Sequence, residues 1–244
     1  MAHRPTRMEP PVTLAHVHAR HRWVMPLAGT VFVLLAIGAA HEWLPWDRPI
    51  TKAAVDARTP STDAVALKVS FLGSTPVVLS VAFVAAAVAW RRSPRLAVAI
   101  VVIALARPLA EWALKELIGR DRPVGDRLVA GRGPSFPSGH PMAAASSWCL
   151  LPLVVELYAR KPLVWWATVV TTWTLAVGVA ATRVWLGVHW TSDVVGGLLL
   201  AVLGVAVAER IMHHTYSRRT PLRTPGRAQI ELVAFIPRPT KEHL

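Results

Sequence analysis

The chain has 244 residues, of which 53% are apolar, and its 27 lysines and arginines give it a formal net charge of +13. This balance is too apolar for an ordinary soluble domain. The basic residues stand mostly at the ends of apolar runs, as membrane proteins require, and this placement argues against a nucleic-acid-binding protein. The single cysteine, Cys149, excludes an intrachain disulfide.

Six apolar stretches are each about 18 or more residues long, which is enough to cross the ~30 Å hydrocarbon core of a bilayer. In chain order they cover residues 24–41, 65–90, 96–118, 140–158, 163–182 and 190–211. Because lipid offers no partner to backbone N–H and C=O groups, each stretch must form a helix. The sequence therefore predicts an all-α fold, an integral membrane bundle of six transmembrane helices over residues 24–211.

Two basic segments flank this predicted bundle. Residues 1–23 form a basic N-terminal segment, and residues 212–244 form a basic, proline-containing tail that we expect to be flexible. The first apolar stretch lacks a small-x-small cleavage site in a suitable context, so we expect it to be retained as a span.

The distribution of basic residues predicts how the spans are oriented. Sixteen of the 27 lysines and arginines fall in the two termini and in the turns at 91–95 and 160–161. Six spans would bring all four segments to one side, and the positive-inside rule makes that side the cytoplasm. We therefore expect a multi-pass protein of the inner cell membrane with both termini in the cytoplasm. The loop at 119–139 then faces outward although it carries four arginines, which suggests that these charges have a function.

Three polar clusters interrupt the apolar sequence, and the predicted topology places all of them at outer ends of spans. The first runs from Lys115 to Pro123 at the end of the third span. The second runs from Phe136 to His140 at the start of the fourth, and the third from Arg183 to Asp193 between the fifth and sixth. The clusters can therefore meet at one depth near the outer interface.

The residue types in these clusters suit the binding of a phosphate. Lys115, Arg122 and Arg183 supply three cations, and arginine offers a planar fork that grips two oxygens. Ser138 and Gly139 lie at a helix start, where unpaired N–H groups and the helix dipole attract an anion and glycine permits a close approach.

Two histidines and an aspartate add reactive groups to this site. His189 and Asp193 are four residues apart and share a face on a helix, where the carboxylate would fix the tautomer of the imidazole. His140 supplies a second imidazole from another helix, so the two histidines can divide the roles of nucleophile and general acid. The same three side chains are also a known set of metal ligands, but the nearby cations would repel a divalent ion. We therefore expect neither a metal nor another cofactor.

A charged stripe runs along the third predicted span, where Arg107, Glu111 and Lys115 recur every four residues. A charge near the middle of the membrane must be paired. The sequence favours an ion pair between Arg107 and Glu111. The alternative is that Glu111 acts on Lys115, a residue of the site, without itself contacting the substrate.

The three clusters resemble the signature of the type 2 phosphatidic acid phosphatase (PAP2) family. That signature reads Lys-x6-Arg-Pro, Pro-Ser-Gly-His and Ser-Arg-x5-His-x3-Asp, and all its spacings are matched between Lys115 and Asp193. Thr182 stands where serine is commoner, which keeps the hydroxyl. The order of spans is also similar to that of the family, so the resemblance covers roughly residues 24–211.

The resemblance implies a membrane enzyme that hydrolyses a lipid phosphate or diphosphate without a metal. His189 would attack phosphorus and form a phosphohistidine, Asp193 would hold it, and His140 would protonate the leaving oxygen and then activate water. The residues implied in phosphate binding are Lys115, Arg122, Ser138, Gly139 and Arg183.

Several functional alternatives stay open at this stage. The candidate substrates are isoprenoid diphosphates, phosphatidic acid and phosphatidylglycerol phosphate, which the sequence does not separate. A lipid phosphotransferase would use the same site, and a haloperoxidase would share the oxyanion site but not six spans. A non-catalytic transporter or lipid-binding protein would also bury charges, but it would not need two imidazoles facing three cations. We expect the membrane and a lipid phosphate as partners and no nucleic acid; the oligomeric state is left open.

Overall fold

The computed structural model of the protein describes residues 14–159 and 161–219, and no β-strand occurs in these residues. The helices are, in chain order, α1 (Leu14–Ala40), α2 (Asp47–Asp56), α3 (Pro60–Phe71), α4 (Thr75–Trp90), α5 (Pro94–Ile118), α6 (Gly139–Trp148), α7 (Leu151–Glu156), α8 (Pro162–Trp185) and α9 (Thr191–Arg219). The predicted all-α fold class is confirmed for this part of the chain.

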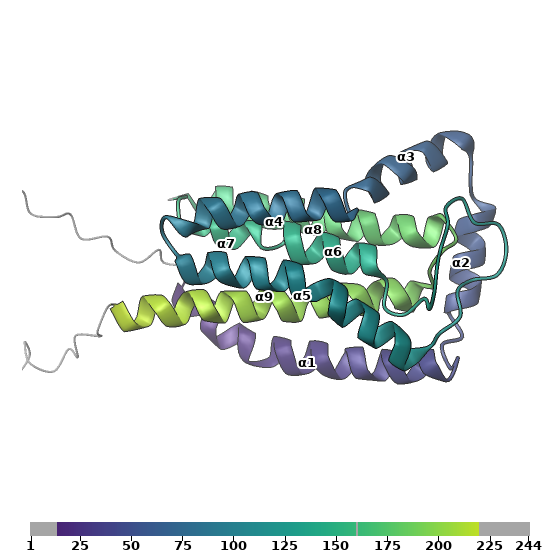
Figure 1. Ribbon diagram of the computed structural model, residues 1–244, viewed down its shortest axis with the longest axis horizontal. Coiled ribbons are helices and arrows are strands. Elements are labelled where there is room, and N and C mark those ends of the chain that lie inside the picture. The colour runs from purple at the N-terminus through teal and green to yellow at the C-terminus, as the bar shows by residue number, and fades with distance from the viewer. Residues whose placement is uncertain (1–13, 160, 220–244) are drawn as a thin grey trace, which may run out of the picture.

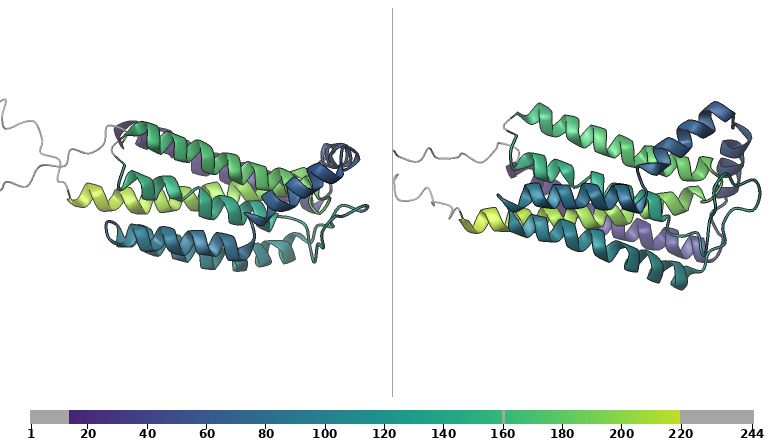
Figure 2. Two further views of the ribbon diagram at one scale, coloured as in Figure 1. Left: turned by 90° about the horizontal axis from the view of Figure 1, so that it is seen from above. Right: turned by 45° about the horizontal axis from the view of Figure 1, so that its top comes forward.

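The long helices run side by side along the longest axis of the molecule (Figure 1). The start of α1 and the end of α9 lie at one end of this bundle. At the other end, α2 lies across the helices beside the loop of residues 119–138 (Figures 1 and 2). The central helix is α6, which packs against α4, α5, α8 and α9 and buries most of its residues. The start of α6 is therefore enclosed by the helices around it.

The outer surface of the bundle is apolar enough for lipid. Within the described residues, four helical segments are long and apolar enough to cross a membrane on their own, namely residues 23–40, 94–118, 162–185 and 191–212. The helices α3 and α4, which are bent by 42° at their junction, pass the same test only when they are counted together as one broken span. Exposed on α5 are Val102, Leu105, Leu109 and Trp112. A multi-pass membrane protein is therefore confirmed, while the number of six crossings stays a prediction.

The second predicted span is broken where it approaches the middle of the bundle. Its helix stops at Phe71 and restarts at Thr75, and Pro76 in the first turn of α4 has no N–H with which to continue a preceding helix. Gly73 lies in the break, and a Cβ atom there would be only 2.6 Å from Val179 Cγ1 and 3.1 Å from the carbonyl oxygen of His140. The break thus lets the chain pack directly on the start of α6.

The fourth predicted span is also divided. A turn at Cys149 and Leu150 separates α6 from α7, and Pro152 again occupies the first turn of the second helix. Neither piece has the length of a span, so a crossing by α6 and α7 together stays a prediction.

Helical structure continues past the predicted ends of the bundle. The first helix begins at Leu14 instead of residue 24, and the last runs to Arg219 instead of residue 211. Residues 1–13 and 220–244, which include most of the tail that we expect to be flexible, lie outside the described residues.

Candidate active site

The three polar clusters meet at the end of the bundle that carries α2 (Figure 1). Lys115 and Arg183 lie in the last turns of α5 and α8. The first turns of α6 and α9 supply His140 and Asp193. A hydrogen bond of 3.0 Å from Ser138 N to Asp193 O joins the starts of these two helices. The structure thus brings together the groups that the sequence places at one depth.

The ring of His189 is held at both nitrogens. Its Nδ1 lies 3.3 Å from Asp193 Oδ2, which also accepts a 2.9 Å hydrogen bond from Trp190 N. Its Nε2 lies 3.1 Å from Arg122 Nη1. Because a guanidinium only donates and a carboxylate only accepts, the two contacts fit one neutral tautomer, with the proton on Nδ1 and a lone pair on Nε2.

Burial keeps His189 neutral. The residue is 3% exposed, and desolvation lowers the pKa of its imidazole from 6.5 to about 4. The hydrogen bond and negative charge of Asp193 oppose this shift, whereas the positive charges of Arg122 and Arg183 add to it. The unprotonated Nε2 is therefore the ordinary state of this histidine at neutral pH.

The side chain of Arg122 is fixed by the loop that precedes α6. Its guanidinium donates to four backbone carbonyls, those of Arg132, Gly133, Pro134 and Val188. A Cβ atom at Gly131 would come within 3.0 Å of Arg122 Cδ, so this glycine leaves room for the side chain. The loop thus presents one cation to Nε2 of His189 in a set geometry.

Two of the predicted phosphate-binding groups are buried without a complete set of partners. Arg183 donates from Nη1 to Ser70 Oγ at 2.7 Å, but its Nε has no hydrogen-bond partner among the described residues. Ser138 Oγ likewise has none there. Since buried polar groups are almost always hydrogen-bonded, these two atoms are suited to the oxygens of a bound anion.

The second imidazole belongs to the same site. His140 is partly buried in the first turn of α6. It interacts electrostatically with Arg183, His189 and Lys115, which come from three other parts of the chain. Two imidazoles on separate elements thus share one group of cations, as the sequence predicts.

The charged stripe of α5 ends in this site. Glu111 accepts a 2.9 Å hydrogen bond from Arg107 and a 2.7 Å hydrogen bond from Lys115. Its carboxylate also lies against the start of α6, because a Cβ atom at Gly139 would be within about 2 Å of Glu111 Oε1. The expected pair with Arg107 is present, and so is the contact with Lys115 on which the alternative depends.

Comparison with known proteins agrees with this arrangement. A sequence model of the PAP2 superfamily matches residues 95–217. Phosphatidylglycerophosphatase B of Bacillus subtilis (strain 168) is 30% identical over 189 residues, which are 73% of this chain and 90% of that protein. This chain belongs to the PAP2 superfamily. The predicted family and the predicted class of enzyme, a membrane lipid phosphatase, are confirmed by these matches.

Three further proteins are similar to this chain. A putative undecaprenyl-diphosphatase, YbjG of Escherichia coli (strain K12), is 33% identical over 48% of this chain and 60% of its own. The crystal structure of a transmembrane PAP2-type phosphatidylglycerolphosphate phosphatase from Bacillus subtilis matches with a TM-score of 0.72 and 26% identity, over 82% of this chain and all of that one. Aquifex aeolicus LpxE, at 17% identity and a TM-score of 0.56 over 68% of this chain and 96% of that one, shares the fold.

The structure of this PAP2 protein adds residues that the motifs did not point to. Arg120 lies inside the variable part of the first motif, yet its side chain is buried and donates to Asp193 Oδ1 at 2.7 Å. Asp47 and Ser192 complete a network around it. No spacing links Asp47 to residues 73 and 145 positions away, so only the folded structure brings them together.

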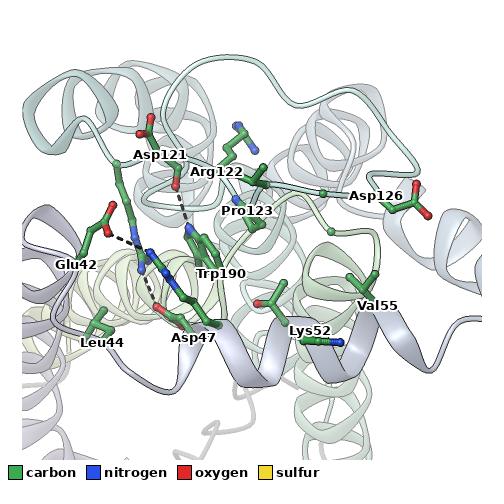
Figure 3. Close-up of a pocket in the computed structure, with 16 residues that line it drawn as sticks. Glu42, Leu44, Asp47, Lys52, Val55, Asp121, Arg122, Pro123, Asp126 and Trp190 are labelled. Carbon is green, nitrogen blue, oxygen red and sulfur yellow. Dashed lines mark hydrogen bonds and ion pairs between the residues drawn. The ribbon is translucent and has the colours of Figure 1, made fainter.

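A cavity of about 510 Å³ adjoins the site on the side of α2. It lies between α2 and the loop of residues 120–126, and Trp190 stands between them, with its Nε1 donating to the carbonyl oxygen of Asp121 (Figure 3). Arg120 and Arg122 also line this cavity. The network around His189 therefore borders a cavity outside the helix bundle.

Proposed function

We propose that this PAP2 protein hydrolyses a lipid phosphate or diphosphate through a phosphohistidine on His189, at the outer face of the inner membrane and without a metal. The observation that carries the proposal is the arrangement of the His189 ring. A proton held on Nδ1 by Asp193 leaves Nε2 with a lone pair, and Arg122 adjoins that atom. A buried, neutral imidazole becomes a nucleophile for phosphorus once the guanidinium of Arg122 moves from Nε2 to the oxygens of the bound phosphate.

The reaction divides between the two histidines. Nε2 of His189 attacks phosphorus, a P–N bond forms, and the P–O bond to the lipid breaks. His140 protonates the departing oxygen, and the negative charge of a bound phosphate favours the protonated imidazole that this step needs. His140 then takes a proton from water, the water oxygen attacks phosphorus, and the P–N bond breaks to release phosphate.

The remaining site residues bind the non-bridging oxygens. Lys115, Arg122 and Arg183 supply the positive charge, and Ser138 and Gly139 supply the start of α6. The unpartnered Ser138 Oγ and Arg183 Nε support these roles, because an anion would satisfy both. Because the transition state spreads charge over the equatorial oxygens, fixed cations stabilise it more than the substrate.

The membrane arrangement follows from the same proposal. Six crossings, with α3–α4 and α6–α7 each counted as one, leave both termini in the cytoplasm and the site outside. The bundle of residues 24–211 is the catalytic domain, and residues 1–23 and 212–244 are cytoplasmic basic segments. The basic turn at residues 91–95, at the end of the bundle away from His189, supports this orientation.

The names of the relatives narrow the substrate. Two classes occur among them, phosphatidylglycerophosphatases and a putative undecaprenyl-diphosphatase. Phosphatidylglycerol phosphate and an isoprenoid diphosphate are therefore the first substrates to test, with phosphatidic acid third. A phosphotransferase would pass the phosphoryl group from the same phosphohistidine to another hydroxyl instead of water.

The test compares His189→Ala and His140→Ala with the wild-type protein in detergent. We expect each substitution to lower phosphate release by about 10² to 10⁴ or more, because each removes a reacting group. Protein quenched in alkaline detergent should carry label from a lipid with radioactive phosphorus in the wild type and none in His189→Ala, because the P–N bond of phosphohistidine is stable in base and hydrolyses in acid. Turnover that persists in folded His189→Ala protein would contradict the proposal and favour a non-catalytic role for the site.

A further inference from the structure

A buried network lies behind the His189–Asp193 pair. Arg120 donates from Nη1 to Asp193 Oδ1 at 2.7 Å and from Nη2 to Asp47 Oδ2 at 2.7 Å. Ser192 joins the same groups, since Arg120 Nη1 lies 2.6 Å from its Oγ and its backbone N donates to Asp47 Oδ1 at 2.8 Å. The network therefore connects α2, the variable part of the first motif and the start of α9.

These side chains are withdrawn from water. The side chains of Arg120, Asp47 and Asp193 are 6%, 2% and 0% exposed. Arg48 and Lys52, on the same short helix as Asp47, are 80% and 75% exposed. The side chain of Asp47 thus points from α2 into the network and away from solvent (Figure 3). The ring of Trp190 covers the guanidinium of Arg120 at 5.6 Å from its centroid.

We infer that Arg120 and Asp47 are positioning residues for the nucleophile: they fix the carboxylate of Asp193 and set how strongly it attracts the proton on His189. The inference rests on the proposed role of His189. One oxygen of Asp193 faces the imidazole and the other faces Arg120. The carboxylate therefore cannot rotate without losing a charge-assisted hydrogen bond.

The charges of the network suit a nucleophile that becomes cationic. With a neutral His189, two carboxylates and one guanidinium leave one excess negative charge in a buried place. When Nε2 forms its bond to phosphorus while Nδ1 keeps its proton, the ring becomes cationic and the excess is neutralised. A second guanidinium in place of Asp47 would remove the excess negative charge and with it this preference. Asp47 without Arg120 would leave Asp193 with no cationic partner in the network.

Arg120 and Asp47 should therefore act on His189 in opposite directions. The positive charge of Arg120 weakens the attraction of Asp193 for the proton on His189. Asp47 binds the same guanidinium, and its negative charge offsets part of that effect. The other groups that act on the imidazole are Arg122 from the loop, Arg183 from α8 and His140 from α6, and these stay unchanged in both variants.

The experiment measures kcat and KM for phosphatidylglycerol phosphate in the full-length protein. It also follows the rate of phosphoenzyme formation from about pH 2.5 to 9, because the pKa of His189 is lowered to about 4 and a shift of about one unit in either direction must fall inside the range. The variants are Arg120→Gln and Asp47→Asn. The matched control is Arg58→Gln, because Arg58 is another buried arginine at the same end (8% exposed) that bonds the carbonyl oxygens of Trp185 and Asp126 and not Asp193.

We expect Arg120→Gln and Asp47→Asn to lower kcat at least tenfold with KM changed less than threefold. The acid limb of the phosphoenzyme profile should move up by about one pH unit in Arg120→Gln and down by about one in Asp47→Asn. In Arg58→Gln it should coincide with that of the wild type. This pair of opposite shifts is not expected from loss of packing alone.

Three outcomes would overturn the inference. The first is a set of acid limbs that coincide in all folded variants. The second is a shift of the same sign in both charge variants. The third is failure of both to fold, which would assign the network to stability. Phosphoenzyme and turnover in His189→Ala would instead overturn the proposed function itself, whatever the network variants do.

Discussion

The carboxylate of Asp193 faces His189 Nδ1 at 3.3 Å, while Arg122 Nη1 occupies the other side of the ring at 3.1 Å from Nε2. The buried ring can keep both contacts only in its neutral form with the proton on Nδ1. The free energy of folding should therefore respond to the protonation of this one residue.

The first prediction concerns acid stability. The pKa of His189 is lowered to about 4 by burial, whereas an unfolded histidine has a value near 6.5. Between these values the unfolded chain binds a proton that the folded protein does not, so stability contributed by neutral His189 falls as the pH falls from about 6.5 to about 4. The thermal midpoint of the wild type should fall over this window more than that of His189→Gln. Parallel curves for the two proteins would contradict the assignment.

The second prediction is inhibition by vanadate with no need for a metal. Vanadate resembles five-coordinate phosphorus, which the cations around His189 should bind more tightly than the substrate. Phosphate release in detergent should be unaffected by EDTA and lost at vanadate concentrations well below KM. If EDTA stops the reaction and Mg²⁺ restores it, His140, His189 and Asp193 must be reconsidered as ligands.

The parts of the site that could be predicted are those with a fixed spacing along the chain. Pairs such as His189 and Asp193, or Glu111 and Lys115, are four residues apart, and helical geometry brings them together. Asp47 and Arg120 are 73 residues apart in the chain, and no sequence pattern predicts that they are in contact. Their contact depends on how α2 lies across the bundle, which no periodicity encodes.

The limits of the fold prediction have a similar cause. Hydropathy counts apolar residues and is insensitive to a break in the backbone, so the stretch at 65–90 and the stretch at 140–158 were both expected as single helices. Pro76 and Pro152 carried the missing signal, since proline favours the first turn of a new helix. The break beside Pro76 includes Gly73, which packs on His140.

The third prediction concerns membrane orientation. Val124, in the loop before α6, is 96% exposed, and Arg91 lies in the turn at the other end of the bundle. In a Cys149→Ser background, Val124→Cys should react with a membrane-impermeant thiol reagent in intact cells, and Arg91→Cys should react only after lysis. The reverse pattern would place the site in the cytoplasm.

The fourth prediction concerns the contact between α5 and α6. A methyl group at Gly139 would collide with Glu111, whose Oε1 lies about 2 Å from the Cβ position. Gly139→Ala should push this carboxylate away from the start of α6 and lower turnover at least tenfold. Gly178→Ala is the matched control, because its Cβ would make only an ordinary contact, 3.6 Å from Val69. Equal activity of the two variants would show that the close approach is not required.

The last prediction separates the two roles of Glu111. Glu111→Leu leaves Arg107 without its partner inside the bundle, so the double variant Arg107→Leu/Glu111→Leu should be more stable than Glu111→Leu alone. Arg107→Leu keeps the pair between Glu111 and Lys115 and should be the milder single change. The double variant also removes the acceptor 2.7 Å from Lys115 Nζ. Because that contact fixes where the ammonium lies, we expect turnover to stay at least tenfold below the wild type, about 1.4 kcal/mol of barrier. A double-mutant cycle that records thermal stability and turnover checks both parts. A stable double variant with normal turnover would limit Glu111 to balancing Arg107.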